Sequence, residues 1–200
     1  MRGMERASER IETDFDMMDF LSDPIPSGQK TDEPRNFGMT EWRDIMTPRQ
    51  LVVNYEYLQA FRKYKPDIED EYNKKKADAI LTILSLASSR ALSFNTRLSQ
   101  WHHEIGCPSK IFTDNNFAPK KMFADNNLTA PRRGYLQRLE QVIESYEDLA
   151  SYTENAESAE IAKIDAARLS ERWANNSVDV AVIDPPYYSS IMYAELSDVF

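Results

Sequence analysis

The stretch that most constrains the fold lies near the end of the sequence. Residues 178–183 read V-D-V-A-V-I and are followed directly by D-P-P-Y-Y. A short apolar run rich in β-branched residues is typical of a strand buried on both faces of a sheet. The predicted strand ends at Asp184, because Pro185 and Pro186 have no amide hydrogen to donate to a neighbouring strand. In open α/β sheets, ligands bind at the carboxyl ends of the strands.

The residues after this predicted strand suit the transfer of a methyl group to the exocyclic amine of a nucleobase. The Asp184 carboxylate and the Pro185 carbonyl can each accept one N–H of that amine, since proline loses only its donor. Tyr187 offers a ring on which a flipped-out base can stack, a contact worth about 1–3 kcal/mol. Holding the amine in line with a methyl donor then lowers the barrier without a covalent enzyme intermediate.

The motif D-P-P-Y at residues 184–187 resembles the catalytic motif of amino-group DNA methyltransferases. The longer string D-P-P-Y-Y-S-S-I-M-Y-A-E-L-S-D-V-F is similar to one subfamily, the large adenine-specific DNA methylases that carry a zinc ribbon. Segments at residues 38–51 (G-M-T with T-P-R-Q-L) and 94–101 (F-N-T-R-L with a later Trp) resemble further parts of that subfamily. The resemblance covers residues 37–200.

The resemblance implies adenine methylation in DNA, with S-adenosyl-methionine as the cofactor and restriction or phage defence as the usual setting. Asp184, Pro185, Pro186 and Tyr187 would be the catalytic residues, and Asp165 would lie near the adenine of the cofactor.

The cofactor-binding segment of that subfamily lies upstream of the matching region. This chain has five glycines, and no two are close enough to form the Gly-rich turn that a methyl donor needs. We therefore expect a C-terminal-side portion of the enzyme, inactive alone: either a fragment, or a split-gene product whose missing cofactor-binding half is a separate chain.

The expected fold class is α/β, with a partial Rossmann-like methyltransferase sheet preceded by a mostly helical region. Residues 1–36 are expected to be a flexible acidic lead-in, with a short helix around residues 11–21. Residues 37–155 should be helical apart from a basic loop at 105–133, and residues 156–200 should form the α/β core.

Local signals predict the elements of this arrangement. Thr47, a proline after it and Gln50 form a capping-box pattern that begins a helix to about residue 63, with a break at Pro66. Further helices are predicted at residues 67–101 and 135–152. A strand at 160–165, a brief helix at 167–174 and the strand at 178–183 follow. A last helix should present polar side chains to the pocket, namely Tyr193, Glu195 and Asp198.

A local excess of basic residues suggests contact with DNA. The chain has a formal net charge of −9, but residues 105–138 contain six basic and two acidic residues. Such a basic surface on an acidic protein suits phosphate contacts, although a solvated loop explains it equally well. The candidate DNA-binding residues are Lys110, Lys120, Lys121, Arg132, Arg133 and Arg138.

Other classes of protein are disfavoured. The single cysteine, Cys107, allows no internal disulfide and fits a reducing cytoplasm. Adjacent His102 and His103 point to different sides of any regular element, so no metal site is expected. No apolar run approaches the roughly 20 residues of a membrane-spanning helix, and no secretory leader pattern opens the sequence.

Two alternatives remain open from the sequence. The same motif suits methylation of the exocyclic amine of cytosine, or of amines in RNA or protein. The chain could instead be a non-catalytic helical module that binds DNA or a partner and retains the D-P-P-Y turn.

Overall fold

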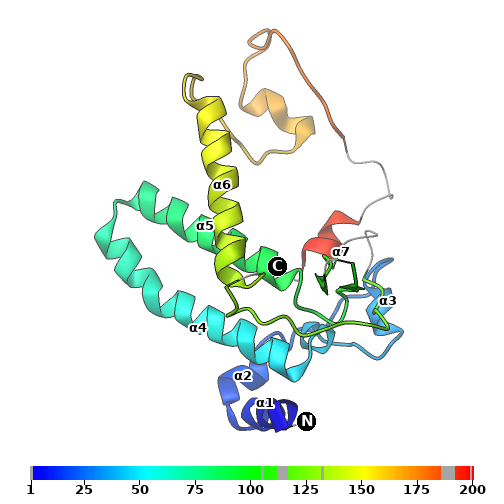
Figure 1. The fold of residues 1–200 in the computed structure, drawn as a ribbon. Coiled ribbons are helices and arrows are strands. Elements are labelled where there is room, and N and C mark those ends of the chain that lie inside the picture. The colour runs from blue at the N-terminus through cyan, green and yellow to red at the C-terminus, as the bar shows by residue number, and fades with distance from the viewer. Residues whose placement is uncertain (1, 105, 112–116, 132, 186–191, 199) are drawn as a thin grey trace.

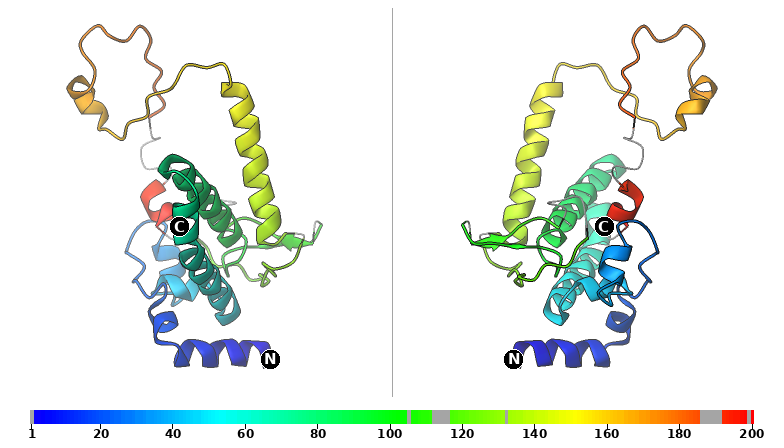
Figure 2. Two further views of the ribbon diagram at one scale, coloured as in Figure 1. Left: turned by 90° about the vertical axis from the view of Figure 1, so that its left-hand side faces the viewer. Right: turned by 90° about the vertical axis from the view of Figure 1, so that its right-hand side faces the viewer.

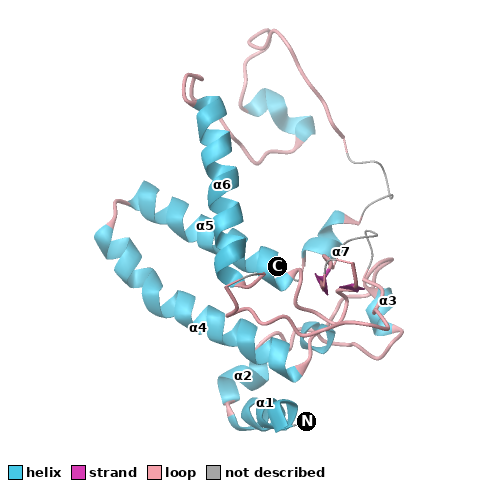
Figure 3. Ribbon diagram, viewed as in Figure 1, coloured by secondary structure: helices cyan, strands magenta, loops and turns pink. Residues whose placement is uncertain are grey.

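The computed structural model describes residues 2–104, 106–111, 117–131, 133–185, 192–198 and 200 (Figure 1). Its frame consists of three long helices: α4 (Pro48–Glu71), α5 (Lys74–Leu92) and α6 (Tyr135–Thr153). Helices α4 and α5 form an antiparallel hairpin, and α6 packs against α5 (Figure 1). The sheet among the described residues is a two-stranded antiparallel ribbon of β1 (Trp101–His102) and β2 (Cys107–Pro108) (Figure 3).

Helix α4 begins as the sequence predicts. The Thr47 side chain accepts a hydrogen bond from the Gln50 amide, and the Gln50 side chain accepts one from the Thr47 amide, which completes a capping box. The predicted break at Pro66 is wrong, because the helix continues to Glu71. Pro66 leaves the carbonyl of Arg62 without a helical donor, but both residues are exposed, so water can satisfy it. The chain turns instead at Asn73, whose side chain accepts from the Lys76 amide and caps α5.

Helix α5 ends at Leu92, earlier than the predicted residue 101. Side chains of the following turn bond to nearby groups: the Leu98 amide donates to Thr96 Oγ1 over 3.2 Å, and Thr96 Oγ1 lies 3.2 Å from Ser99 Oγ. Such local bonds compete with the helix. The Arg97 amide donates to the carbonyl of Ile45 over 2.8 Å, which ties this turn to the segment before α4.

Helix α6 occupies the predicted span and is anchored at its first residue. The hydroxyls of Tyr135 and of Tyr57 on α4 lie 2.6 Å apart, and the Tyr57 hydroxyl donates to the carbonyl of Leu84 on α5. The three long helices therefore meet at one hydrogen-bonded point. Burial and the neighbouring Tyr57 hydroxyl raise the pKa of Tyr135.

The hydrophobic core lies at one end of this frame and is built largely from segments between the helices. The 3-10 helix η1 (Trp42–Ile45) lies within it, and the Trp42 and Phe117 rings are 5.8 Å apart. The buried members of the core are Ile25, Met39, Trp42, Ile45, Met46, Leu51, Leu98, Ile111, Phe117 and Leu196. Segments that are far apart in the sequence therefore share one core.

Residues 2–36, expected to be a flexible lead-in, form helices in the structure. These are α1 (Arg2–Thr13), α2 (Phe15–Asp19) and α3 (Asp32–Arg35), and α1 packs against α4. Met17 and Ile25 have no exposed surface. Asp14 caps α2 by accepting from the Met17 amide. Although this segment is acidic overall, it contains a few apolar residues that are completely buried.

Residues 154–185 arch away from the rest of the chain (Figure 2). This arch, as we call these residues, contains the 3-10 helix η2 (Ala166–Glu171), close to the predicted brief helix, and leads toward α7 (Tyr193–Ser197). The predicted strands at 160–165 and 178–183 are not formed. A parallel strand needs a neighbour for its N–H and C=O groups, and no other described strand lies beside either segment. The partial Rossmann-like sheet therefore stays a prediction.

Candidate functional site

Asp184 and Pro185, the first two residues of the D-P-P-Y motif, lie at the end of the arch. Asp184 and Pro185 are both exposed and belong to no regular element. Pro186 and Tyr187 lie outside the residues that the structure describes. The two described members of the motif are therefore open to a ligand or to another polypeptide.

The apolar run before the motif is also exposed. The exposed fractions of its apolar residues are 59% for Val178, 76% for Val180, 93% for Val182 and 81% for Ile183. Complete burial of one such side chain contributes about 1.5–3 kcal/mol. Covering this run would therefore be strongly favourable, as the sequence pattern of a buried strand indicates.

Asp165, the predicted cofactor contact, caps η2. Its carboxylate accepts a hydrogen bond of 2.9 Å from the Ala167 amide, and the residue is exposed. This hydrogen bond gives Asp165 a structural role within its own segment. A contact with the cofactor stays a prediction.

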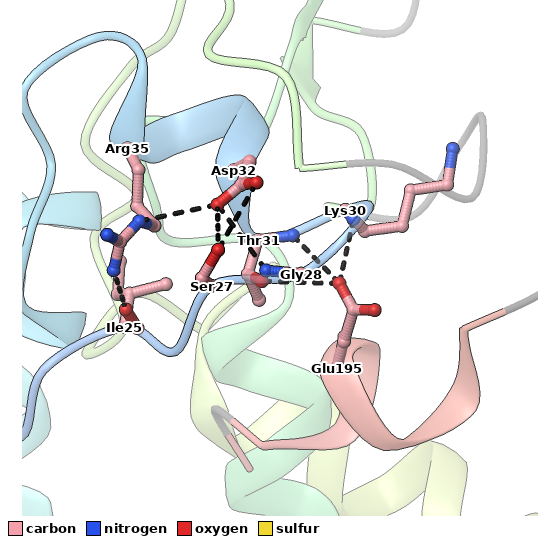
Figure 4. A network of polar contacts seen from close by, with 8 residues as sticks. All are labelled: Ile25, Ser27, Gly28, Lys30, Thr31, Asp32, Arg35 and Glu195. Carbon is pink, nitrogen blue, oxygen red and sulfur yellow. Dashed lines mark hydrogen bonds and ion pairs between the residues drawn. The ribbon is translucent and has the colours of Figure 1, made fainter.

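Glu195 on α7 has a partner that the sequence did not indicate. Its Oε2 atom accepts from the backbone nitrogens of Lys30 (2.7 Å) and Thr31 (3.0 Å) and from the Thr31 hydroxyl (3.2 Å) (Figure 4). Burial acts to raise the pKa of Glu195, but the hydrogen bonds from Thr31 and Lys30 outweigh it, so the pKa lies below its usual value. Glu195 thus connects α7 to residues 28–31, whereas Tyr193 and Asp198 are exposed.

The contact of Glu195 depends on a glycine. A Cβ atom at Gly28 would lie 2.5 Å from the Glu195 carboxylate and 2.7 Å from Thr31 Oγ1, too close for any side chain (Figure 4). Asp32 accepts from the Ser27 hydroxyl over 3.1 Å beside this glycine. The absence of a side chain at Gly28 therefore leaves room for the Glu195 carboxylate beside the loop before α3.

The candidate DNA-binding residues differ in their exposure. Lys110 and Lys121 are exposed, and Lys120 and Arg133 are half-buried. Arg132 lies outside the described residues. Arg138 is 7% exposed, so this conformation leaves little of it for a surface phosphate.

Arg138 belongs to a cluster of guanidinium groups. Its Nη1 atom and Nε of Arg90 each donate to Gln141 Oε1 over 3.1 Å, and its guanidinium carbon lies 4.1 Å from the centre of the Phe94 ring. Burial lowers the pKa of Arg138, and the nearby positive charges of Arg90 and Arg133 lower it further. None of the ion pairs formed within the described part of the chain involves these three arginines. Among the described residues, no carboxylate therefore forms an ion pair with the positive charge of this cluster.

Sequence reasoning missed a second group of polar residues at the start of α4. Asp125 accepts from the Thr47 hydroxyl over 2.8 Å and from Arg49 Nε over 2.8 Å, and the Asn126 amide donates to Asn95 Oδ1 over 3.0 Å. Thr47, Arg49 and Asn95 lie in the segments at residues 38–51 and 94–101, for which we expected from the sequence a common function with the D-P-P-Y motif. That shared feature was the available signal, but spacing along the chain could not show that they meet.

Comparison of the chain with protein-family models, with curated proteins and with solved structures found no match. None of the helices in the described ranges is long and apolar enough to cross a membrane. Those ranges also contain no group of three or more His, Cys, Asp or Glu side chains placed to hold a metal ion.

Proposed function

We propose that this chain is the base-binding portion of a DNA methyltransferase that methylates the exocyclic amine of adenine. The observation that supports this most is the D-P-P-Y motif directly after a β-branched run that is exposed in the structure. A carboxylate and a carbonyl at the end of a strand suit the two N–H groups of an amino group. Asp184 and Pro185, the two described residues of the motif, are exposed, as substrate binding requires.

In the proposed reaction, Asp184 accepts one hydrogen bond from the amino group and the Pro185 carbonyl accepts the other. These contacts turn the nitrogen lone pair toward the methyl group, and Tyr187 stacks on the base. S-adenosyl-methionine, when bound, supplies the methyl group. The methyl group would pass to the amine nitrogen as its bond to the cofactor sulfur breaks, and Asp184 would accept the proton that the amine then loses.

The proposal assigns the exposed run to a sheet completed by another polypeptide segment. Residues 178–183 would pair with strands of the cofactor-binding half, and their apolar side chains would become buried on both faces. Asp165 is the one described residue that we assign to the cofactor. The remaining cofactor contacts would come from that other half.

The experiment combines the chain with its candidate partner. The chain is incubated with DNA and methyl-labelled cofactor, alone and with the product of the gene immediately upstream. We expect label on adenine in the mixture, and loss of that label with Asp184→Ala. Asp148→Ala, which removes an exposed carboxylate on α6, should leave labelling unchanged.

Two other results would overturn this proposal. Label on cytosine or on RNA would favour the same chemistry with a different acceptor. DNA retention that is indifferent to Asp184→Ala, without label in any mixture, would favour a non-catalytic binding module. The half-buried Arg90 and Arg133 of the arginine cluster are the observation that favours this second function, since positive charge without an ion pair among the described residues attracts phosphate.

A further inference from the structure

The second half of helix α6 projects from the rest of the chain. In its first half, Arg138 is buried and Gln141 accepts a hydrogen bond from Arg90 of α5, but every residue from 143 to 153 is exposed. Figure 2 shows this end of α6 rising clear of α4 and α5. We call residues 143–153 the free end of α6. An isolated helix of about three turns is marginal in water, so the free end gains from any surface that packs on it.

Apolar side chains line one face of the free end. Ile143, Tyr146 and Leu149 follow at intervals of three residues, and their exposed fractions are 37%, 55% and 65%. The half-buried Leu139 and Val142 lie on the same side of the helix one turn earlier. The stripe is therefore partly covered in the first half of α6 and exposed in the second. An amphipathic helix normally packs such a face, and a contiguous exposed apolar face marks an interaction site.

The charges beside this stripe are negative. Glu140, Glu147 and Glu154 recur every seven residues, so they form a row along the helix next to Ile143. All three are exposed, and none forms an ion pair within the described part of the chain. From residue 140 to residue 160 the chain has seven acidic residues and no basic one. The face is therefore complementary to a positively charged partner.

The dipole of α6 adds to this negative charge. The carboxyl end of a helix carries partial negative charge, which basic side chains stabilise. Helix α6 has no basic residue in its last turn, and its C-cap is Glu154. A partner that supplies both an apolar cover and positive charge would stabilise the free end on both counts.

A second copy of the chain does not supply this combination at α6. In a symmetric pair the same surface of each copy meets the other, so the two α6 helices would bring their acidic rows together. Like charges at such a contact are repulsive. The charge therefore favours a different polypeptide.

We propose that the free end of α6 docks a basic amphipathic helix of another polypeptide. The apolar side chains of that helix cover Ile143, Tyr146 and Leu149, and its lysine or arginine side chains lie beside the row of glutamates. The surface uses no residue of the D-P-P-Y motif, so it stands independently of the proposed methyl transfer.

The test uses a synthetic helical peptide of leucine and lysine in heptad order, with calorimetry to measure its affinity. An analogue with glutamate in place of lysine is the control peptide. We expect the wild-type chain to bind the leucine–lysine peptide, more weakly as salt is added, and not to bind the analogue.

Two double variants separate the apolar and the charged contributions. Tyr146→Ala with Leu149→Ala should weaken binding by about tenfold or more, and Glu140→Gln with Glu147→Gln by about threefold or more. The matched controls are Tyr64→Ala with Leu86→Ala, and Asp67→Asn with Asp70→Asn, at exposed positions on α4 and α5. Each control pair should change the affinity by less than about twofold. Equal effects of the variants and their controls would overturn the proposal.

Self-association is a further outcome that would overturn it. Sedimentation of the chain alone at increasing concentration would then show a dimer that Tyr146→Ala with Leu149→Ala abolishes. In that case a second copy, and not a basic partner, covers the free end of α6.

A last measurement uses only the wild-type chain. Amide hydrogen exchange at residues 143–153 should slow when the leucine–lysine peptide is added and stay unchanged with the glutamate analogue. If the leucine–lysine peptide leaves exchange at these residues unchanged, no basic helix docks there and the proposal is wrong.

Discussion

The Oε2 atom of Glu195 lies 2.7 Å from the backbone nitrogen of Lys30, a residue 165 positions earlier in the sequence. This contact fixes the helix that follows the D-P-P-Y motif against the loop that precedes α3 (Figure 4). Leu196, the next residue, is buried in the hydrophobic core. The chain on the far side of the motif is therefore anchored, whereas the arch before the motif is exposed.

Gly28→Ala should destabilise the protein by detaching Glu195. The added Cβ atom would lie 2.5 Å from the Glu195 carboxylate, so either the side chain or the loop must move. We expect a lower midpoint of thermal unfolding, measured by circular dichroism. Gly3→Ala is the matched control, since its Cβ would make ordinary contacts of 3.6 and 3.7 Å with Arg49. In helix α1 this control should be neutral or stabilising by up to about 1 kcal/mol. Equal effects of the two substitutions would contradict the assigned contact.

Glu195 should make stability depend on pH in the acid range. Its pKa is lower in the folded chain than the ordinary value of 4.5, so its contribution is present above that pH. As the pH falls below 4.5, the unfolded chain takes up the proton first, and the contribution is lost as the pH passes the folded pKa. Urea unfolding of the wild type and Glu195→Gln at several pH values checks this. The difference in unfolding free energy between the two should shrink as the solution is acidified, and a constant difference would count against it.

Thr47→Ala should lower the free energy of unfolding by about 1–2 kcal/mol. The substitution removes the cap of α4, and it also removes the hydroxyl that donates to Asp125. Asn73→Ala removes the cap of α5 and should cost about 1 kcal/mol. Chemical denaturation gives both values. Only Thr47→Ala should also alter the amide resonances of residues 125–127.

Val182→Asp tests whether the apolar run is exposed in the isolated chain. Because 93% of this side chain is exposed, the substitution should change the unfolding free energy by less than about 0.5 kcal/mol. Ala87→Asp, at a site with no exposed surface, places an unpaired charge in the interior and should unfold the chain. In the mixture with the proposed cofactor-binding half, Val182→Asp should abolish methylation. Strong destabilisation of the isolated chain by Val182→Asp would show that the run is already covered.

Arg138→Met should leave stability unchanged or raise it by about 1 kcal/mol. The guanidinium is buried, packs on Phe94 and has no carboxylate partner among the described residues, so removing its charge relieves desolvation and repulsion from Arg90. Urea unfolding measures the effect. A loss of several kcal/mol would mean that an anion compensates the arginine in the free protein.

Local signals in the sequence predicted the helices well where the chemistry itself is local. The capping box of Thr47 and Gln50 begins α4 as predicted, and the periodicity from residue 135 predicts α6, because both depend on neighbouring residues. The end of α4 was mispredicted, since Pro66 lies on a solvated stretch of helix where the missing hydrogen bond is tolerated. The end of α5 was mispredicted because Thr96 and Ser99 bond within a turn, and because Asn126 and Ile45, far along the chain, bond to Asn95 and Arg97 of that turn.

For the candidate site, the sequence alone determined the motif and its chemistry: an acid, a carbonyl and aromatic rings after an apolar run. Whether that run becomes a strand depends on neighbouring strands that supply partners for its backbone hydrogen bonds. Only the tertiary structure decides whether such neighbours are present. The tertiary structure alone brought Glu195 to Lys30 and Asp125 to Thr47. Contacts between residues so far apart follow from the packing of the whole core, which no local pattern of residues encodes.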